Sequence, residues 1–233
     1  MLAIFKREFK SYFTTPIGYI ILAAFYFFSG LYFWAIYQSG IPQVEYVISQ
    51  LLSVSVFLIP ILTMRLMSED RRQKVDQVLL TSPVKLTSII LGKYFAAFAV
   101  FAMCFIPTII FEIIVMSYVS VNIFTFLYAL LGILLLGGAL ISIGMLVSSL
   151  TESPVISAIL TLVINITISY MSAIAQMINI EWVSTAVSKL AFIDMFTNFG
   201  NEYFSLPDVI YFLSIIVAFL FLCVRALEKR RWA

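Results

Sequence analysis

The chain has 233 residues, of which 63% are hydrophobic and 11% are charged, and its formal net charge is +2. Its mean hydropathy is +1.08, which excludes a soluble globular domain, whose apolar share is nearer one half. The composition predicts an integral membrane protein. Each crossing of a ~30 Å hydrocarbon layer takes roughly 20 apolar residues, so we expect about six spans in a single domain over residues 1–233.

The segment before Pro16 predicts a helix that lies in the membrane interface. Its apolar and aromatic residues are interleaved with Lys6, Arg7, Glu8 and Lys10, a pattern typical of interfacial helices. The apolar run that follows is too long for a signal peptide and has no small-residue cleavage site, so we expect it to be retained as a span. Pro16 should end the interfacial helix and redirect the chain.

Apolar runs predict an all-α membrane protein with six transmembrane helices. The expected spans are Ile17 to Tyr37, Val44 to Met64, Ile89 to Met116, Phe124 to Leu150, Pro154 to Ile178 and Val209 to Arg225. Pro60 and Pro107 fall inside the second and third spans, where each removes one backbone hydrogen bond and predicts a kink.

The basic residues predict the topology, because Lys and Arg near span ends are held on the cytoplasmic side. With six spans and both termini inside, thirteen of the fourteen Lys and Arg lie on one side, and Lys189 is the exception. The loops at 38–43, 117–123 and 179–207 then face out. The last of these is long and aromatic, so we expect re-entrant or interfacial helices there.

The polar stretch from Arg65 to Lys93 predicts a cytoplasmic docking element. It carries a charge cluster, then a short amphipathic segment with an apolar stripe, then a Thr-Ser-Pro turn. An apolar stripe suits a groove on another protein, and the flanking charges suit ion pairs at its rim. The alternative is a solvated loop held inside by its charge, which would not need the apolar stripe.

The fifth predicted span is the most polar. Ser157, Thr161, Asn165, Ser169, Ser172 and Gln176 recur every three or four residues, so they share one helical face. Such a stripe must face protein or water. Two interpretations stay open: hydrogen bonding between helices, or one wall of a substrate path, with Ser49 and Ser53 on the opposite wall.

Several chemistries lack the residues that they need. The chain has no His, which removes His-based catalysis and the common zinc sites. Gly92-Lys93 is followed by Tyr94 and no P-loop occurs. Cys104 and Cys223 lie in apolar runs, as small buried hydrophobic residues do. We therefore expect no enzyme activity and no cofactor, metal or nucleic acid bound by this chain.

Glu112 is the one acidic residue deep inside a predicted span, so it is a functional candidate. Lys93 marks the inner boundary, and nineteen residues at ~1.5 Å each place Glu112 roughly 28 Å away, near the outer interface. We expect a carboxylate that reaches the interface or pairs with a loop.

Several segments together resemble the membrane subunit of an ABC-2 type exporter. They are Arg7 to Pro16, Glu69 to Arg72, Leu79 to Val84, Leu91 to Lys93, Ser148 to Glu152 and Leu227 to Trp232. The resemblance covers nearly the whole chain, and it rests on the order and spacing of these segments. The resemblance implies a type V exporter fold, in which two permease subunits assemble with two separate cytoplasmic ATPase subunits that bind ATP and Mg²⁺.

The resemblance also implies roles for individual residues. The loop between the second and third spans would be the coupling helix, and the second and fifth spans would line the path. The expected ATPase contacts are Glu69, Arg71, Arg72, Asp76, Val78, Leu79, Leu80, Thr81, Ser82 and Pro83. The expected path residues are Ser49, Ser53, Asn165, Ser169, Ser172 and Gln176.

The implied function is the permease subunit of an exporter in a bacterial cytoplasmic membrane. It would work as a homodimer or with a paralogue, surrounded by membrane lipid. The alternative is a membrane anchor that transmits force from an ABC ATPase to a periplasmic or surface assembly.

Overall fold

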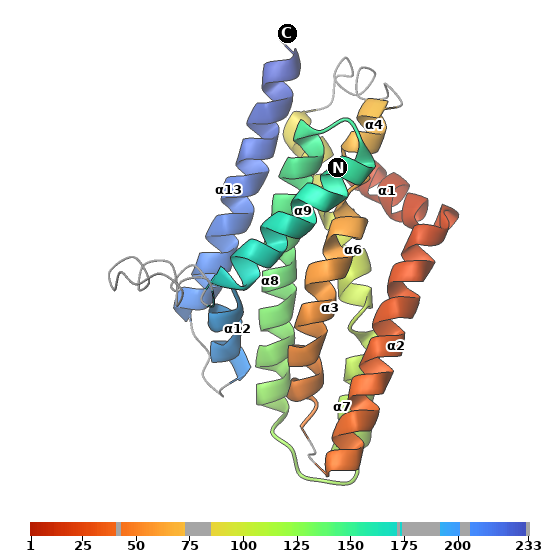
Figure 1. Cartoon of the computed structure of the whole chain (residues 1–233), viewed down its shortest axis with the longest axis vertical. Helices are drawn as coiled ribbons and strands as arrows, with labels where there is room; N and C mark the ends of the chain where they lie inside the picture. Colours follow the sequence, from red (N-terminus) through yellow and green to blue (C-terminus); the bar gives the residue numbers. More distant parts are fainter. Residues whose placement is uncertain (41–42, 73–84, 172, 174–191, 201–205, 232–233) are drawn as a thin grey trace.

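The computed structural model describes residues 1–40, 43–72, 85–171, 173, 192–200 and 206–231 (Figure 1). Within these ranges the elements are α-helices and no strand occurs. The helices are α1 (Leu2–Thr14), α2 (Pro16–Ser39), α3 (Glu45–Thr63), α4 (Ser68–Arg72), α6 (Leu86–Met103), α7 (Ile106–Met116), α8 (Ile123–Leu150), α9 (Pro154–Ser169), α12 (Phe192–Gly200) and α13 (Leu206–Arg231). The all-α prediction is confirmed for the described part of the chain.

Five of the predicted spans are present as helices long and apolar enough to cross a membrane. They are Pro16–Ser39, Glu45–Arg72, Leu86–Met116, Ile123–Leu150 and Leu206–Lys229. The fifth predicted span is described only as α9, which has 16 residues, below the usual length of a complete span. The count of six spans therefore stays a prediction, although the chain is a multi-pass membrane protein.

Helix α8 forms the centre of the bundle. It contacts α13, α3, α12, α9 and α6, and most of its residues are buried. Its glycines allow this close packing: a Cβ at Gly137 would clash with the ring of Phe101 on α6, and one at Gly144 with Thr63 on α3. Small residues at helix contacts are the usual means of close packing in membranes.

The third predicted span is broken, as Pro107 predicts. Helix α6 ends at Met103 and α7 starts at Ile106, because Pro107 has no N–H to donate to the carbonyl of Met103. The Tyr26 hydroxyl on α2 donates to that carbonyl instead, at 3.2 Å. Pro60 in the second predicted span does not break its helix in this way, because α3 continues through Pro60 to Thr63.

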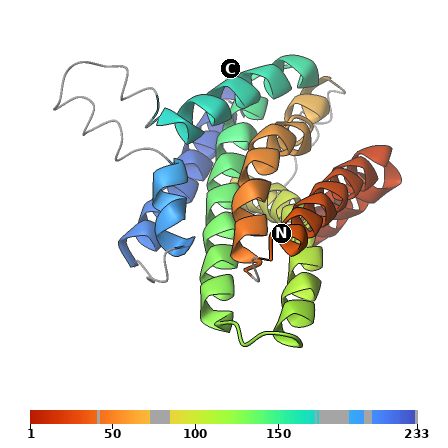
Figure 2. The same cartoon turned by 60° about the horizontal axis from the view of Figure 1, so that its bottom comes forward.

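Helix α9 is polar on its buried side and apolar on its exposed side. Ser157, Thr161, Asn165 and Ser169 are all fully buried. Exposed positions include Ile156, Ile159 and Val163. The buried side packs against α3 and α8, which α9 crosses obliquely (Figures 1 and 2). Helices of soluble proteins usually bury their apolar side, so this opposite arrangement suits a helix whose exposed face meets lipid.

Both ends of the described chain lie at the end of the bundle that also carries α4 (Figure 1). Helix α1 crosses this end at an angle to α2. A Cβ at Gly18 would lie 2.5 Å from the carbonyl oxygen of Tyr12, so glycine lets α2 start this close to α1. The turn between α7 and α8 lies at the opposite end.

The long segment expected between the fifth and sixth spans is described only in part. Helix α12 packs its buried Phe192, Phe196 and Phe199 against the bundle, and Phe199 lies on Gly132 of α8. Residues 174–191 and 201–205 lie outside the described residues, so the re-entrant arrangement stays a prediction.

Candidate functional site

A buried lysine joins three helices at the end of the bundle that carries both termini. Lys93 on α6 is only 1% exposed, and its ammonium lies 3.0 Å from Glu8 on α1 and 2.7 Å from Asp70 on α4. Arg7 pairs with the same Glu8 oxygen at 2.5 Å. Because a charge removed from water needs an opposite charge nearby, Lys93 fixes α1 and α4 to the bundle.

The environment of α1 keeps its polar groups in defined protonation states. Burial disfavours the charged Glu8 carboxylate, but Lys93 and Arg7 outweigh it, so the pKa of Glu8 is held below its ordinary value. Burial raises the pKa of the Tyr12 hydroxyl, which stays neutral and donates to the carbonyl of Leu62 at 2.8 Å. Helix α1 is thus held to the end of α3 by a neutral hydrogen bond and to α6 by an ion pair.

The turn between α3 and α4 is held by Ser148 near the end of α8. The Ser148 hydroxyl donates to the carbonyl of Met64 and accepts from the backbone N–H groups of Met67 and Ser68, each at 3.1 Å. One side chain therefore satisfies three backbone groups that the end of a helix leaves without partners.

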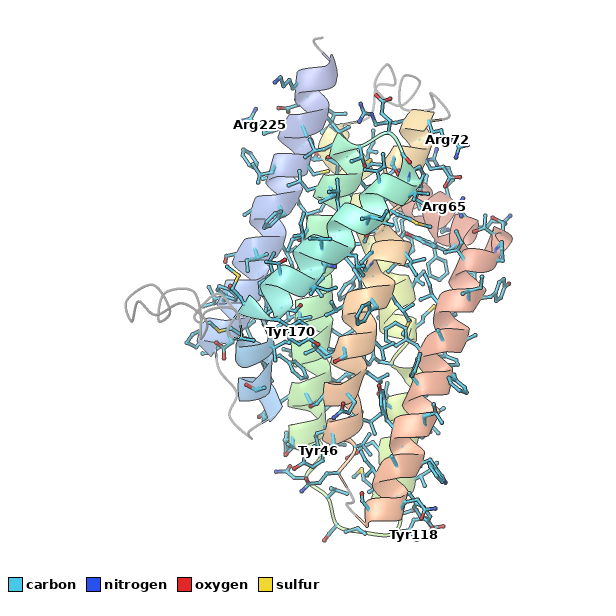
Figure 3. The ribbon with its side chains drawn as sticks, in the orientation of Figure 1. Tyr46, Arg65, Arg72, Tyr118, Tyr170 and Arg225 are labelled. Carbon is cyan, nitrogen blue, oxygen red and sulfur yellow. The ribbon has the colours of Figure 1, made fainter. Side chains whose placement is uncertain are left out.

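Arg65 ties the same turn to α1. Its guanidinium pairs with Glu69 one turn later, with one contact of 2.8 Å, and donates to the Thr15 hydroxyl at 3.0 Å. Arg71 pairs with Glu152, in the turn between α8 and α9, at 3.0 Å. The start of the polar loop is therefore fixed to α1, α6 and the α8–α9 turn. Figure 3 labels Arg65 and Arg72 at this end of the bundle.

These contacts locate the described part of the predicted coupling residues. Glu69 and Arg71 are partly buried in ion pairs within the chain, whereas Arg72 is exposed at the tip of α4. The remaining predicted coupling residues lie outside the described residues: Asp76, Val78, Leu79, Leu80, Thr81, Ser82 and Pro83. Their contact with an ATPase stays a prediction.

A polar cavity of about 340 Å³ lies between α1 and the α3–α4 turn. Its charged lining consists of Arg7, Arg65, Glu8, Glu69 and Asp70, so both α1 and the α3–α4 region contribute charges of both signs. Among the described residues no group of three His, Cys, Asp or Glu is placed to hold a metal ion. The arrangement can transmit movement between helices through ion pairs.

The predicted path residues fall into two separate environments. Asn165 and Ser169 are fully buried on α9, and none of their polar side-chain atoms has a hydrogen-bond partner among the described residues. On α3, Ser49 is exposed and Ser53 is partly exposed. The four side chains therefore do not line one open space within a single chain. Ser172 and Gln176 lie outside the described residues.

Sequence reasoning missed the residues at the centre of the charge network. Lys93 entered the prediction as a boundary marker and as part of two sequence segments, and Glu8 and Tyr12 entered it as parts of the N-terminal interfacial segment; no contact between them was expected. A signal was present: Lys93 lies inside the predicted span that starts at Ile89, and a charge inside a span requires a counter-charge. Nothing in the sequence indicated that Glu8, 85 positions earlier, would supply it.

The apolar helices define a multi-pass membrane protein, with a buried charge network at one end of its bundle. A family model described as ABC-2 family transporter protein matches residues 37–227. The match covers most of the chain, so the chain belongs to this family, as its resemblance indicated. No curated protein matches it significantly.

Proposed function

We propose that this chain is the permease subunit of an ABC exporter that works with separate ATPase subunits. Members of this family typically pair with an ATPase subunit, and the match over residues 37–227 supports the same arrangement here. The end of the bundle that carries both termini and α4 faces the cytoplasm in this proposal, in keeping with the distribution of basic residues.

The attachment of α4 is the observation that carries the proposal. A docking element transmits force only if it is fixed to the helices that must move. Lys93 holds Asp70 of α4 to α6 and α1, and Arg71 holds α4 to Glu152 before α9. A push on the loop after α4 would thus reach α1, α6 and α9 together.

A second permease copy is supported by the outward face of α3. Ser49 and Gln50 are exposed there, and Ser53 is partly exposed about 12 Å from the start of the helix. Polar side chains at this depth are better placed against protein or water than against lipid. We infer that this face of α3 meets a second copy and lines the path with it, which favours transport over a purely mechanical role.

Co-purification tests the ATPase partner. Arg72→Glu reverses an exposed charge beside the predicted coupling residues and should lower both the recovery of ATPase subunit and the ATP hydrolysis of the purified complex. Lys229→Glu is the matched control, because it makes the same change at an exposed position on α13, at the same end of the bundle. Equal loss in both variants, or in neither, would contradict docking at α4.

A crosslinking experiment tests the second copy separately. In a background without Cys104 and Cys223, a cysteine at Ser53 should form a disulfide-linked dimer on oxidation. A cysteine at Val163, on the exposed apolar face of α9, should not. Dimers from Val163→Cys and none from Ser53→Cys would place the second copy elsewhere.

A further inference from the structure

An apolar pocket lies at the end of the bundle opposite α4. It has a volume of about 560 Å³ between the ends of α2, α3 and α7, and Phe33, Ile36, Tyr37, Val44, Val115 and Tyr118 contribute to its lining. Tyr37 and Tyr118 are 77% and 83% exposed, so they form its rim, and Tyr118 marks this end in Figure 3. Pockets of this size accommodate small organic molecules.

A buried carboxylate lies one helical turn from Val115, which lines this pocket. Glu112 precedes Val115 by three residues, so the two share one face of α7, with Glu112 one turn deeper in the bundle. Glu112 is 2% exposed. Neither of its carboxylate oxygens has a hydrogen-bond partner among the described residues. The expected reach of this side chain to the interface is therefore not observed.

A second carboxylate adds to the negative charge there. Glu45 follows Val44, which lines the pocket, and it is close enough to Glu112 for the two carboxylates to interact electrostatically. The described Lys and Arg residues all belong to the inner clusters at the opposite end, and Lys189 lies outside the described residues. Glu112 is a buried carboxylate in an apolar setting, and Glu45 is a partly buried carboxylate near it. A buried negative charge favours a cation beside it, because an uncompensated buried charge is costly.

We propose that this pocket binds a lipophilic organic cation, with its apolar body among the rings and aliphatic side chains and its positive charge beside Glu112 and Glu45. Phe33 stacks on Phe111 at 4.2 Å between ring centroids, which gives the pocket a rigid aromatic wall. Aromatic faces near a carboxylate suit an organic cation. A hard metal ion fits less well, because six to eight oxygen ligands are usual for Ca²⁺, and the described lining is mostly aliphatic and aromatic.

Equilibrium binding of tetraphenylphosphonium to the purified full-length chain in a non-ionic detergent tests the proposal. The wild-type chain should bind it. Glu112→Gln should weaken binding by at least about tenfold, because the variant lacks the negative charge that attracts the cation. Glu45→Gln should weaken it less. Triphenylphosphine oxide, which is similar in shape but uncharged, should bind weakly and equally to all three proteins.

Two further variants make the outcome decisive. Glu152→Gln removes an exposed carboxylate at the opposite end and should bind as the wild type does. Val115→Trp fills the pocket but leaves both carboxylates, so it should also weaken binding by about tenfold or more. Wild-type affinity in Glu112→Gln and Val115→Trp, or equal affinity for the neutral compound, would overturn the proposal. Neither result depends on an ATPase partner or on transport.

Discussion

Lys93 is a residue whose removal should affect the fold more than its single charge suggests. Without it, Glu8 and Asp70 would remain near each other with one positive charge less between them. Breaking a buried ion pair from one side usually costs about 3–5 kcal/mol. We expect Lys93→Met to lower the thermal unfolding midpoint in detergent clearly, whereas Lys85→Met, at an exposed position, should change it little.

A triple variant separates the charge effect from lost packing. Combining Lys93→Met with Glu8→Gln and Asp70→Asn removes all three charges, and replacing a buried ionic group by neutral groups is often nearly neutral for stability. The triple variant should therefore recover most of the lost stability. If it unfolds as readily as Lys93→Met alone, charge imbalance is not the cause.

Glu8 predicts a pH dependence of stability. Its pKa in the folded chain lies below the ordinary value of 4.5, so its ionised form stabilises the fold above about pH 4.5 and this contribution is lost as the pH falls through the folded pKa. The difference in unfolding midpoint between wild type and Glu8→Gln should be constant at neutral pH and should narrow below about pH 4.5. A difference that widens on acidification would mean that Glu8 is not held as a carboxylate by Lys93.

At the scale of the elements, the α6–α7 break offers a test of how Pro107 is accommodated. Tyr26→Phe removes the donor to the Met103 carbonyl and should cost about 0.5–1.5 kcal/mol. In a Pro107→Ala background the backbone N–H of residue 107 can donate instead, so the same change should cost less. A double-mutant cycle of unfolding free energies measures this coupling, and strictly additive effects would contradict it.

The polar side of α9 has two interpretations, hydrogen bonding between helices and one wall of a substrate path, and cysteine labelling distinguishes them. Cysteines at Asn165 and Ser169, in a background without Cys104 and Cys223, should react with a membrane-impermeant thiol reagent during ATP turnover if the stripe opens to water. A cysteine at Val163, on the apolar face, should stay unreactive toward it. Protection of both buried positions in nucleotide-free and ATP-bound states would favour hydrogen bonding between helices.

The helices were predictable from sequence because lipid imposes simple rules. Span positions follow from apolar runs, and the break in the third span follows from Pro107. The polar stripe of α9 was also visible, but its partners were not, because periodicity gives a face and not the helix that the face meets. Likewise the Glu8–Lys93 pair joins positions far apart in sequence, and only tertiary packing brings them together.

The topology of the whole molecule is a prediction on which the function depends. A reporter that is active only in the cytoplasm should be active when fused after Ala233 and silent when inserted after Val119, between α7 and α8. Insertion near Asn201 should also silence it. This outcome follows from the positive residues at the end that carries both termini. Activity at Val119 with silence at Ala233 would mean that the protein has the opposite orientation in the membrane. Helix α4 would then lie on the side of the membrane opposite the cytoplasm, away from any cytoplasmic ATPase.

The contacts of α1 have a consequence for the order in which a ribosome can complete the structure. Helix α1 is synthesised before its partners: Leu62 for its Tyr12 hydroxyl, then Arg65 for Thr15, and finally Lys93 for Glu8. Until residue 93 has left the ribosome, the Glu8 carboxylate has Arg7 beside it but lacks the lysine with which it is buried in the finished bundle. The N-terminal helix therefore waits at the surface while two spans insert, and it is locked in place only when the third begins.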